Sequence, residues 1–259
     1  MNLSFLANAS YVKNEIKNLG NQTGYIDKES LPTLGTVSRN ENGYPIGYFF
    51  GYKAIGVFQT QEEIDSYISP ATGKPIQPNA APGDTKFEDL NGDGVISDDN
   101  EDRTMIGKPN PDWMVGLTVA ADWNGFDLSA FFQGSFGADV FDALRRYELA
   151  AVNYTSDALE RWTGPGTSNS MPRIVLGDTP KNFRPSTLLV HDASFLRLRN
   201  LQVGYTLPAQ LTRKAYIQRL RFYASFDNLL TITGYKGMDP EIGSTMGIDC
   251  LLYTSDAAD

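Results

Sequence analysis

The chain has 259 residues, with 22 Lys and Arg against 31 Asp and Glu, and its formal net charge is −9. Such an acidic chain lacks the basic surface that nucleic-acid phosphates require, so we expect no nucleic-acid partner. The single cysteine excludes a disulfide scaffold. No apolar run reaches the ~18 residues of a membrane helix, but a membrane barrel stays open as a fold because its strands alternate apolar and polar residues.

The chain opens with a pattern typical of a strand. Apolar side chains recur at every second position from Leu3 to Tyr11, which predicts a strand of period two. Because no signal peptide precedes it, we expect either a cytoplasmic protein or a piece of a longer one. The polar segment 13–42 predicts a long loop, a second strand is expected over residues 46–52, and residues 61–65 predict a short helix.

Oxygen-bearing side chains then follow the spacing of an EF-hand calcium loop. Asp89, Asn91 and Asp93 stand at the first, third and fifth positions of this pattern, and Gly94 at the sixth supplies the sharp turn. Because Ca²⁺ takes about six to eight oxygen ligands, we expect the backbone carbonyl of Val95 at the seventh position to face the ion as well.

The closing ligand of this loop, near residues 89–102, is less regular. The twelfth position holds Asn100 where a bidentate acid is expected, and Glu101 and Asp102 follow it. An insertion in the loop could bring either acid into place, and our ligand set takes Asp102. The alternative is an acidic turn that holds no metal. Since many folds use a calcium loop as a fastener, the loop does not identify the function.

The clearest segment is a pair of long strands, 113–123 and 126–136, joined by Asn124-Gly125. This dipeptide favours a two-residue type I′ turn. Eleven residues at ~3.3 Å each, tilted by ~45°, cover the ~25 Å apolar band of an outer-membrane barrel. Trp113 and Trp123 at the two ends of one apolar face are typical of aromatic girdles. A soluble sandwich is the alternative, although its strands are commonly only ~5–6 residues long.

Alternation on the first of these strands predicts its orientation in the membrane. Val115, Leu117 and Val119 share a face with the two tryptophans and are expected to contact lipid. Thr118 and Asp122 lie on the other face and are expected to point into the barrel lumen.

The second half of the chain continues the pattern of strands and loops. Residues 139–162 shift toward helix and end at a Gly-Pro-Gly stop. Residues 195–207 predict a strand, with a phase change near Arg199 and Asn200 that indicates a β-bulge. Residues 220–228 predict another strand. The sequence therefore predicts an all-β fold: a partial transmembrane antiparallel β-barrel, built as an open curved sheet of long strands with long extracellular loops and a short helix.

Three stretches carry a family resemblance. They are residues 43–53 with 56–59, residues 82–112, and residues 195–208 with 228–230 and 239–241. Through these motifs the chain resembles the C-terminal part of the barrel in the SusC/RagA family of TonB-dependent outer-membrane transporters, up to about residue 249. Family members carry a signal peptide, an N-terminal plug and a barrel of ~22 strands; residues 1–249 lack the first two, show about six or seven strands, and lack the final strand.

The resemblance implies an outer-membrane location in contact with lipid. It also implies that the intact protein imports glycans or peptides, works with a surface lipoprotein of the SusD type and draws energy through TonB. Ca²⁺ would then brace an extracellular loop. The alternative from another class is a secreted, calcium-stabilised β-sandwich that binds carbohydrate, and detergent dependence separates the two.

The last ten residues, 250–259, resemble the in-frame translation of a sequencing adaptor and are expected not to be native; an ordinary polar C-terminus is the alternative.

No enzyme is expected, because His191 beside Asp192 is the single histidine and neither a nucleophile elbow nor a phosphate loop occurs. Trp162 and Tyr147 could stack on a sugar, but we expect them to pack against neighbouring loops.

Overall fold

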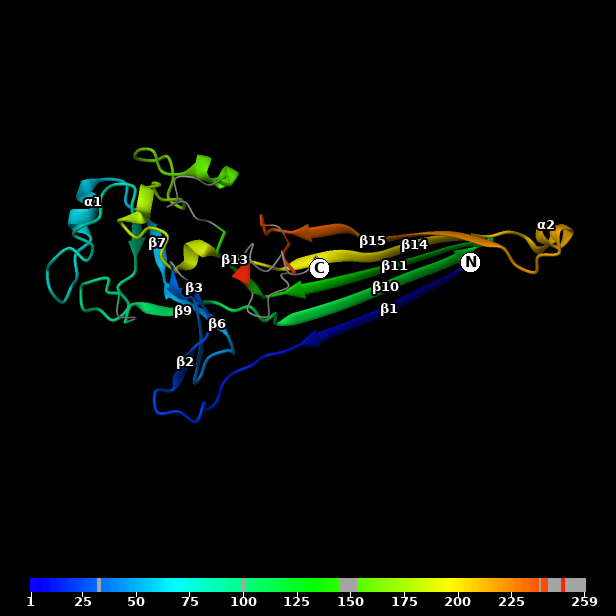
Figure 1. Ribbon diagram of the computed structural model, residues 1–259, viewed down its shortest axis with the longest axis horizontal. Helices are drawn as coiled ribbons and strands as arrows, with labels where there is room; N and C mark the ends of the chain where they lie inside the picture. Colours follow the sequence, from blue (N-terminus) through cyan, green and yellow to red (C-terminus); the bar gives the residue numbers. More distant parts are fainter. Residues whose placement is uncertain (32–33, 99–100, 145–152, 238, 242–247, 250–259) are drawn as a thin grey trace. The chain divides into compact units, whose positions relative to one another are not determined.

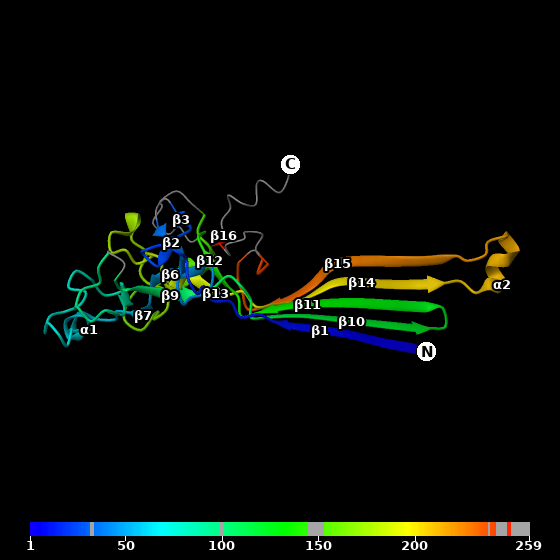
Figure 2. The same ribbon diagram turned by 90° about the horizontal axis from the view of Figure 1, so that it is seen from below.

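Five long antiparallel strands form the principal sheet of the protein. The structure is a computed structural model that describes residues 1–31, 34–98, 101–144, 153–237, 239–241 and 248–249. The strands lie side by side in both views (Figures 1 and 2), in the order β1 (Asn2–Tyr11), β10 (Trp113–Trp123), β11 (Phe126–Phe136), β14 (Phe195–Thr206) and β15 (Arg221–Thr233). All four pairings are antiparallel, so the predicted open sheet of long strands is confirmed.

The chain divides into two compact units. The sheet unit comprises residues 1–13, 110–138 and 192–241, and the loop unit comprises residues 14–109 and 139–191 together with 248–249. The long segments of the loop unit leave the sheet where β1 ends, where β10 begins, where β11 ends and where β14 begins. Because the register pairs these positions with one another, all of the long connections belong to one end of the sheet.

The other end of the sheet carries the short connections. Asn124 and Gly125 join β10 to β11 with φ angles of 48° and 86°, the positive pair that a type I′ turn requires. A longer link with the helical turns α2 (Ala209–Thr212) and η4 (Arg213–Ala215) joins β14 to β15. The two-residue hairpin turn is therefore confirmed.

A β-bulge interrupts the pairing of β14 at the place that the sequence predicts. The register shifts between Leu198 and Asn200, and Asn228 on the facing strand has a φ of 53°. Leu198 pairs with Leu230 before the shift, and Leu201 pairs with Phe226 after it. On the side of β11, the adjacent residues Phe131 and Phe132 pair with Asn200 and Leu198, so Arg199 is the extra residue of β14 in that pairing. It resets the alternation so that leucines continue along one face of the strand. On the side of β15, the extra residue belongs to β15.

The loop unit is built from short strands and turns. Its strands pair as β2 (Tyr25–Asp27), β5 (Ser38–Glu41), β6 (Tyr48–Tyr52) and β9 (Arg103–Gly107); β3 (Ser30–Leu31) with β4 (Gly35–Thr36); β7 (Ala54–Val57) with β8 (Thr85–Phe87); and β13 (Val190–Asp192), β12 (Asp139–Asp142) and β16 (Ile248–Asp249). Its helical elements are α1 (Gln61–Ser66), η1 (Ser156–Glu160), η2 (Leu176–Asp178) and η3 (Thr187–Leu189). No described helix is long and apolar enough to cross a membrane.

A small apolar core holds the loop unit together. Val37, Phe49, Phe141 and Leu189 are buried in one cluster, and the ring centroids of Phe49 and Phe141 lie 5.9 Å apart. These residues come from the two long insertions of the unit. Burial of their side chains is what brings the insertions together.

The structure differs from the sequence-based predictions for segment 13–42, for the strand at 46–52 and for the number of long strands. Segment 13–42 contains β2 to β5, so it is not one long loop. The strand expected over 46–52 exists as β6, but all five of its residues are buried in the smaller sheet, and it does not extend the long sheet. Five long strands therefore replace the expected six or seven among the described residues. The alternation of apolar residues predicted that a strand exists at 46–52, but it does not show which sheet a strand joins.

The helical expectation over 139–162 is wrong at its start, where β12 is a strand, and the helical structure that follows is the short 3₁₀ turn η1. Helix-forming residues later in the segment favoured helix, but residues 139–142 pair with neighbouring strands instead. Residues 145–152 of this segment lie outside the described residues, as do the adaptor-like residues 250–259. The short helix expected near 61–65 is confirmed as α1, with the Thr60 hydroxyl capping its first turn.

The hairpin turn gives a test of this register. Gly125→Ala should destabilise the sheet by about 1–2 kcal/mol, because φ is positive and a Cβ would lie 2.7 Å from the carbonyl oxygen of Thr206. Urea unfolding of the chain in detergent micelles measures the change. Gly234→Ala is the control, since nothing lies within 4 Å of its added Cβ; equal costs at the two sites would contradict the turn assignment.

Candidate functional site

One face of the long sheet is apolar from edge to edge. Each cross-strand row on this face joins side chains of the same kind, for example Leu3, Ala121, Leu128, Val203 and Ala224 in one row and Phe5, Val119, Ala130, Leu201 and Phe226 in the next. Phe5 is 66% exposed and Trp123 is 59% exposed. An exposed apolar surface of this extent indicates a hydrophobic environment such as lipid.

Aromatic side chains gather at the two ends of this face. Tyr11 and Trp113 stand at one end, with ring centroids 4.9 Å apart. Phe126 and Tyr205 stand at the other end, with centroids 4.5 Å apart. The register confirms that Val115, Leu117 and Val119 lie on one face between Trp113 and Trp123, with Thr118 and Asp122 on the opposite face. Their contact with lipid or lumen stays a prediction.

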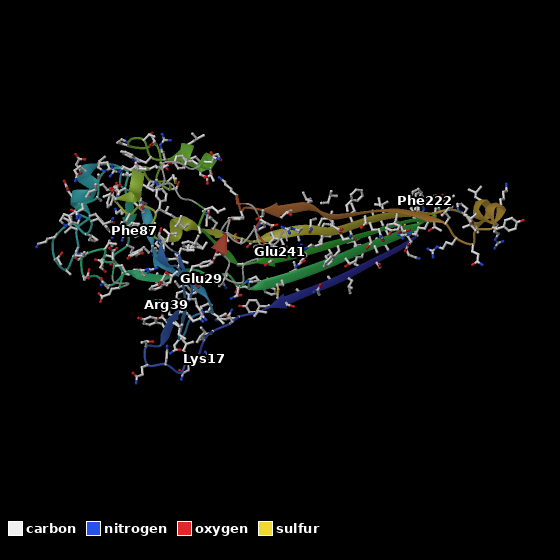
Figure 3. All side chains as sticks on the ribbon, viewed as in Figure 1. Lys17, Glu29, Arg39, Phe87, Phe222 and Glu241 are labelled. Carbon is white, nitrogen blue, oxygen red and sulfur yellow. The ribbon has the colours of Figure 1, made fainter. Side chains whose placement is uncertain are left out.

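The opposite face carries a network of charged side chains around two arginines. Arg197, which is 5% exposed, donates to Glu241 Oε2 at 2.9 Å and to Asp239 Oδ1 at 2.6 Å. Arg199 donates to Gln133 Oε1 at 2.8 Å and also pairs with Glu241. Glu241 and Phe222 lie towards opposite ends of the sheet (Figure 3).

This network ties the segment after β15 back onto the face of β14. Charge-assisted hydrogen bonds of this kind are shorter and stronger than neutral ones, and Arg197 also reaches Thr231 Oγ1 at 2.9 Å. Sequence reasoning did not identify it as a site. The available signal was the two arginines at alternate positions of a strand whose other face is leucine, together with the acids at 239 and 241.

The predicted calcium loop folds as a tight turn in the loop unit. The two carboxylate oxygens of Asp89 accept hydrogen bonds from the backbone N–H groups of Gly92 at 2.8 Å and Gly94 at 2.9 Å. Asp93 Oδ1 accepts from the N–H of Val95 at 2.8 Å. Gly94 has a φ of 89°, and a Cβ there would lie 2.7 Å from Ser69 Oγ. Both the conformation and the close approach therefore require glycine.

Among the predicted ligands, Asn91 contacts Asp93, whereas Asp102 has a different, structural role. The side-chain amide of Asn91 donates to Asp93 Oδ2 at 3.0 Å and to Glu101 Oε2 at 2.9 Å. Asp102 is instead fully buried, and its oxygens accept from the N–H groups of Leu90 at 3.1 Å and Ser97 at 3.0 Å. Asp102 thus fastens the two ends of the loop. Glu101, in contrast, contacts the predicted ligand Asn91.

The metal site stays a prediction. Within the described part of the chain, no group of three or more His, Cys, Asp or Glu side chains is arranged to hold a metal ion. The predicted ligand set differs in kind, because it includes the amide of Asn91 and the carbonyl of Val95. Asn100, the other candidate for closing the loop, lies outside the described residues.

Trp162 and His191 are the other residues that the sequence raised as candidates for sugar binding and catalysis. The indole N–H of Trp162 donates to Gln59 Oε1 at 3.2 Å, and its ring packs so closely on Gly83 that a Cβ there would lie 2.4 Å away. Packing of Trp162 against a neighbouring loop is therefore confirmed, while Tyr147 lies outside the described residues. His191 Nε2 lies 3.8 Å from Asp142 Oδ2.

Comparison with known proteins gives consistent matches. No family profile matches the chain. It is 35% identical over 200 residues to TonB-dependent receptor P3 of Formosa agariphila, covering 77% of the chain and 19% of that receptor. It is 30% identical over 239 residues to receptor P26 of the same organism, covering 91% and 23%. It is 29% identical over 249 residues to TonB-dependent receptor SusC of Bacteroides thetaiotaomicron, covering 95% and 22%.

Solved structures agree with these relatives. The RagAB peptide transporter matches with a TM-score of 0.70 and 26% identity, over 95% of the chain and 25% of that protein. The RagAB peptide importer in its open-open state matches with a TM-score of 0.68 and 25% identity, over 95% and 24%. The chain therefore spans between 19% and 25% of the length of these three receptors and of the matched chains in the two RagAB structures.

The orientation of the sheet can be tested by placing a charge on each face. Leu117→Arg should cost ~2–4 kcal/mol of stability in lipid, because it puts a charge near the middle of the apolar face. Thr118→Arg, one residue later on the opposite face, is the matched control and should cost much less. Unfolding in lipid vesicles measures both values, and equal costs would rule out a lipid-facing role for this face.

Proposed function

Because the chain belongs to the SusC/RagA family of TonB-dependent receptors, which are outer-membrane proteins, we propose that it forms part of a transporter that imports glycans or peptides. Its relatives are receptors and importers, not enzymes. The observation that carries the proposal is the apolar face of the sheet, which runs unbroken over five strands between two sets of aromatic rings.

The edges of the sheet support a place in a larger barrel. β1 and β15 are the two edge strands of the sheet in the described part of the chain. In hydrocarbon, each unpaired backbone N–H or C=O group costs several kcal/mol, so a membrane sheet must close. We infer that the rest of a full-length receptor pairs with both edges.

Partners and energy source are inferred from the same family. A SusD-type surface lipoprotein would sit over the extracellular side, and the TonB complex would supply energy through parts of the receptor outside this chain. The long connections at one end of the sheet support this arrangement, since outer-membrane barrels carry long loops outside and short turns in the periplasm. The two-residue turn at Asn124 and Gly125 would then lie on the periplasmic side.

Ca²⁺ is proposed as a structural brace of one extracellular loop. Asp89, Asn91, Asp93 and the carbonyl of Val95 would be the ligands, with Asp102 or its neighbour Glu101 closing the site. The support is the preformed turn, in which backbone N–H groups already orient the carboxylates of Asp89 and Asp93. Hard oxygen donors of this kind suit Ca²⁺.

The alternative, a secreted β-sandwich that binds carbohydrate, has less support. A sandwich needs a second sheet over the apolar face of the first. The sheet unit contains one sheet among its described residues, and side chains such as Phe5 and Trp123 stay exposed on it.

Transport can be tested in the bacterium that encodes this chain. Deletion of the receptor gene should abolish uptake of a labelled glycan or peptide mixture, and collapse of the proton gradient should have the same effect because TonB would lose its energy source. The chain should also fractionate with the outer membrane. Unchanged uptake in both experiments would argue against a transporter.

The calcium proposal predicts saturable binding of Ca²⁺ to the chain in detergent. At a concentration about 100 times Kd, the ion should stabilise the loop unit by about 2.7 kcal/mol. Asp93→Ala should weaken binding at least about tenfold, whereas Asp65→Ala, an exposed acid on α1, should not. Calorimetric titration measures both, and absence of binding at millimolar Ca²⁺ would refute the site.

A further inference from the structure

Two hollows of the loop unit share the side chains of Lys181 and Arg184. Their volumes are about 530 and 540 Å³, within the ~300–1,000 Å³ of small-molecule sites. The first is lined largely by aliphatic residues, and the second contains Tyr52, Asp98 and Arg103. Both hollows border the same two cations, and we call the two hollows together the Lys181 cleft.

A carboxylate already sits between these cations. Lys181 Nζ donates to Asp98 Oδ2, and Arg184 Nη1 lies 3.7 Å from Asp98 Oδ1. The side chain of Asp98 is 65% exposed, so solvent screens its attraction to Lys181. The two cations thus already contact a carboxylate, and Asp98 would compete with any acidic ligand for them.

Arg184 is held in place before any ligand arrives. Its guanidinium lies 4.7 Å from the ring centroid of Tyr52 and 4.9 Å from that of Phe87, and both rings are buried. Its Nε donates to the carbonyl oxygen of Lys181 at 3.1 Å. The buried Nη1 atom has no hydrogen-bond partner among the described residues. A fixed guanidinium with a spare donor is suited to binding a carboxylate.

The other charged pair of the cleft is already satisfied. Arg173 also lines the first hollow, but its Nε donates to the buried carboxylate of Asp84 at 2.6 Å. This hydrogen bond raises the pKa of Arg173. Asp84 in turn accepts from Asn182 at 3.1 Å. Lys181 and Arg184 are therefore the cations of the first hollow that a ligand would meet.

The rest of the first hollow is lined mainly by aliphatic side chains and contains no aromatic ring among the described residues. The aliphatic lining includes Ile76, Val95, Ile96, Val175 and Pro180, and the polar side chains of Gln77, Asn79 and Thr179 complete it. A sugar would favour flat aromatic surfaces, whereas a branched aliphatic group packs on walls of this kind. The cleft thus places an aliphatic surface directly beside a pair of cations.

We propose that the Lys181 cleft binds an organic carboxylate that carries a branched aliphatic group, as found at the C-terminus of a peptide ending in leucine. Lys181 and Arg184 take the carboxylate, Asp98 gives up its place, and the aliphatic group enters the first hollow. The proposal concerns equilibrium binding to the loop unit. It does not rest on transport, so either proposal can fail without the other.

Calorimetric titration of the 259-residue chain in detergent micelles tests the ligand class. Acetyl-Ala-Ala-Leu with a free C-terminus should bind saturably, and its C-terminal amide should bind at least about tenfold more weakly. If 4-methylpentanoate binds as tightly as the peptide, the free acid is the source of the carboxylate and the proposal holds. Tighter binding of galacturonate than of either aliphatic acid would overturn it, as would binding of none of the probes.

Variants distinguish a built cleft from a surface ion pair. Lys181→Met should weaken binding of the free-acid peptide about tenfold, while Asp98→Asn should tighten it several-fold by removing the internal competitor. Such a gain cannot come from misfolding. Lys17→Met is the control, because Lys17 is exposed and pairs with Glu15 at 2.7 Å outside both hollows. An unchanged affinity in Asp98→Asn, or an equal loss in Lys17→Met, would refute the assignment.

Discussion

Backbone hydrogen bonding in a medium without water is the constraint on which this structure depends. A strand in hydrocarbon must pair every N–H and C=O group with another strand. β10, β11 and β14 meet this condition on both sides, in registers that run almost the whole length of each strand. The length of the strands matches the thickness of the apolar band of an outer-membrane barrel, and their apolar face suits the proposed contact with lipid.

The two faces of the sheet carry different kinds of side chain. Large apolar side chains occupy one face, whereas the other holds Arg197 and Arg199 within hydrogen-bonding distance of acids and amides. The bulge at Arg199 keeps these two faces separate, because it adds a polar residue to β14 on the side of β11 while Leu198 and Leu201 stay on the apolar face. A strand without this extra residue would turn its leucines towards the charged network.

In the loop unit, one short segment serves two proposed sites. Residues 95–98 follow the front half of the calcium loop, and they also contribute Val95, Ile96 and Asp98 to the Lys181 cleft. Asp102 holds this segment in place through the N–H of Ser97.

Local patterns in the sequence determined the long strands, the hairpin turn, the bulge and the turn of the calcium loop, because each depends on neighbours only a few residues apart. Tertiary structure alone decided that β6 joins the small sheet and that Asp102 is buried. It also decided that Glu241 accepts hydrogen bonds from two arginines more than forty residues away. It also decided that Asp98 reaches Lys181 across 83 residues. Periodicity reports which side of a strand is apolar, but the partner of a side chain depends on how distant segments pack.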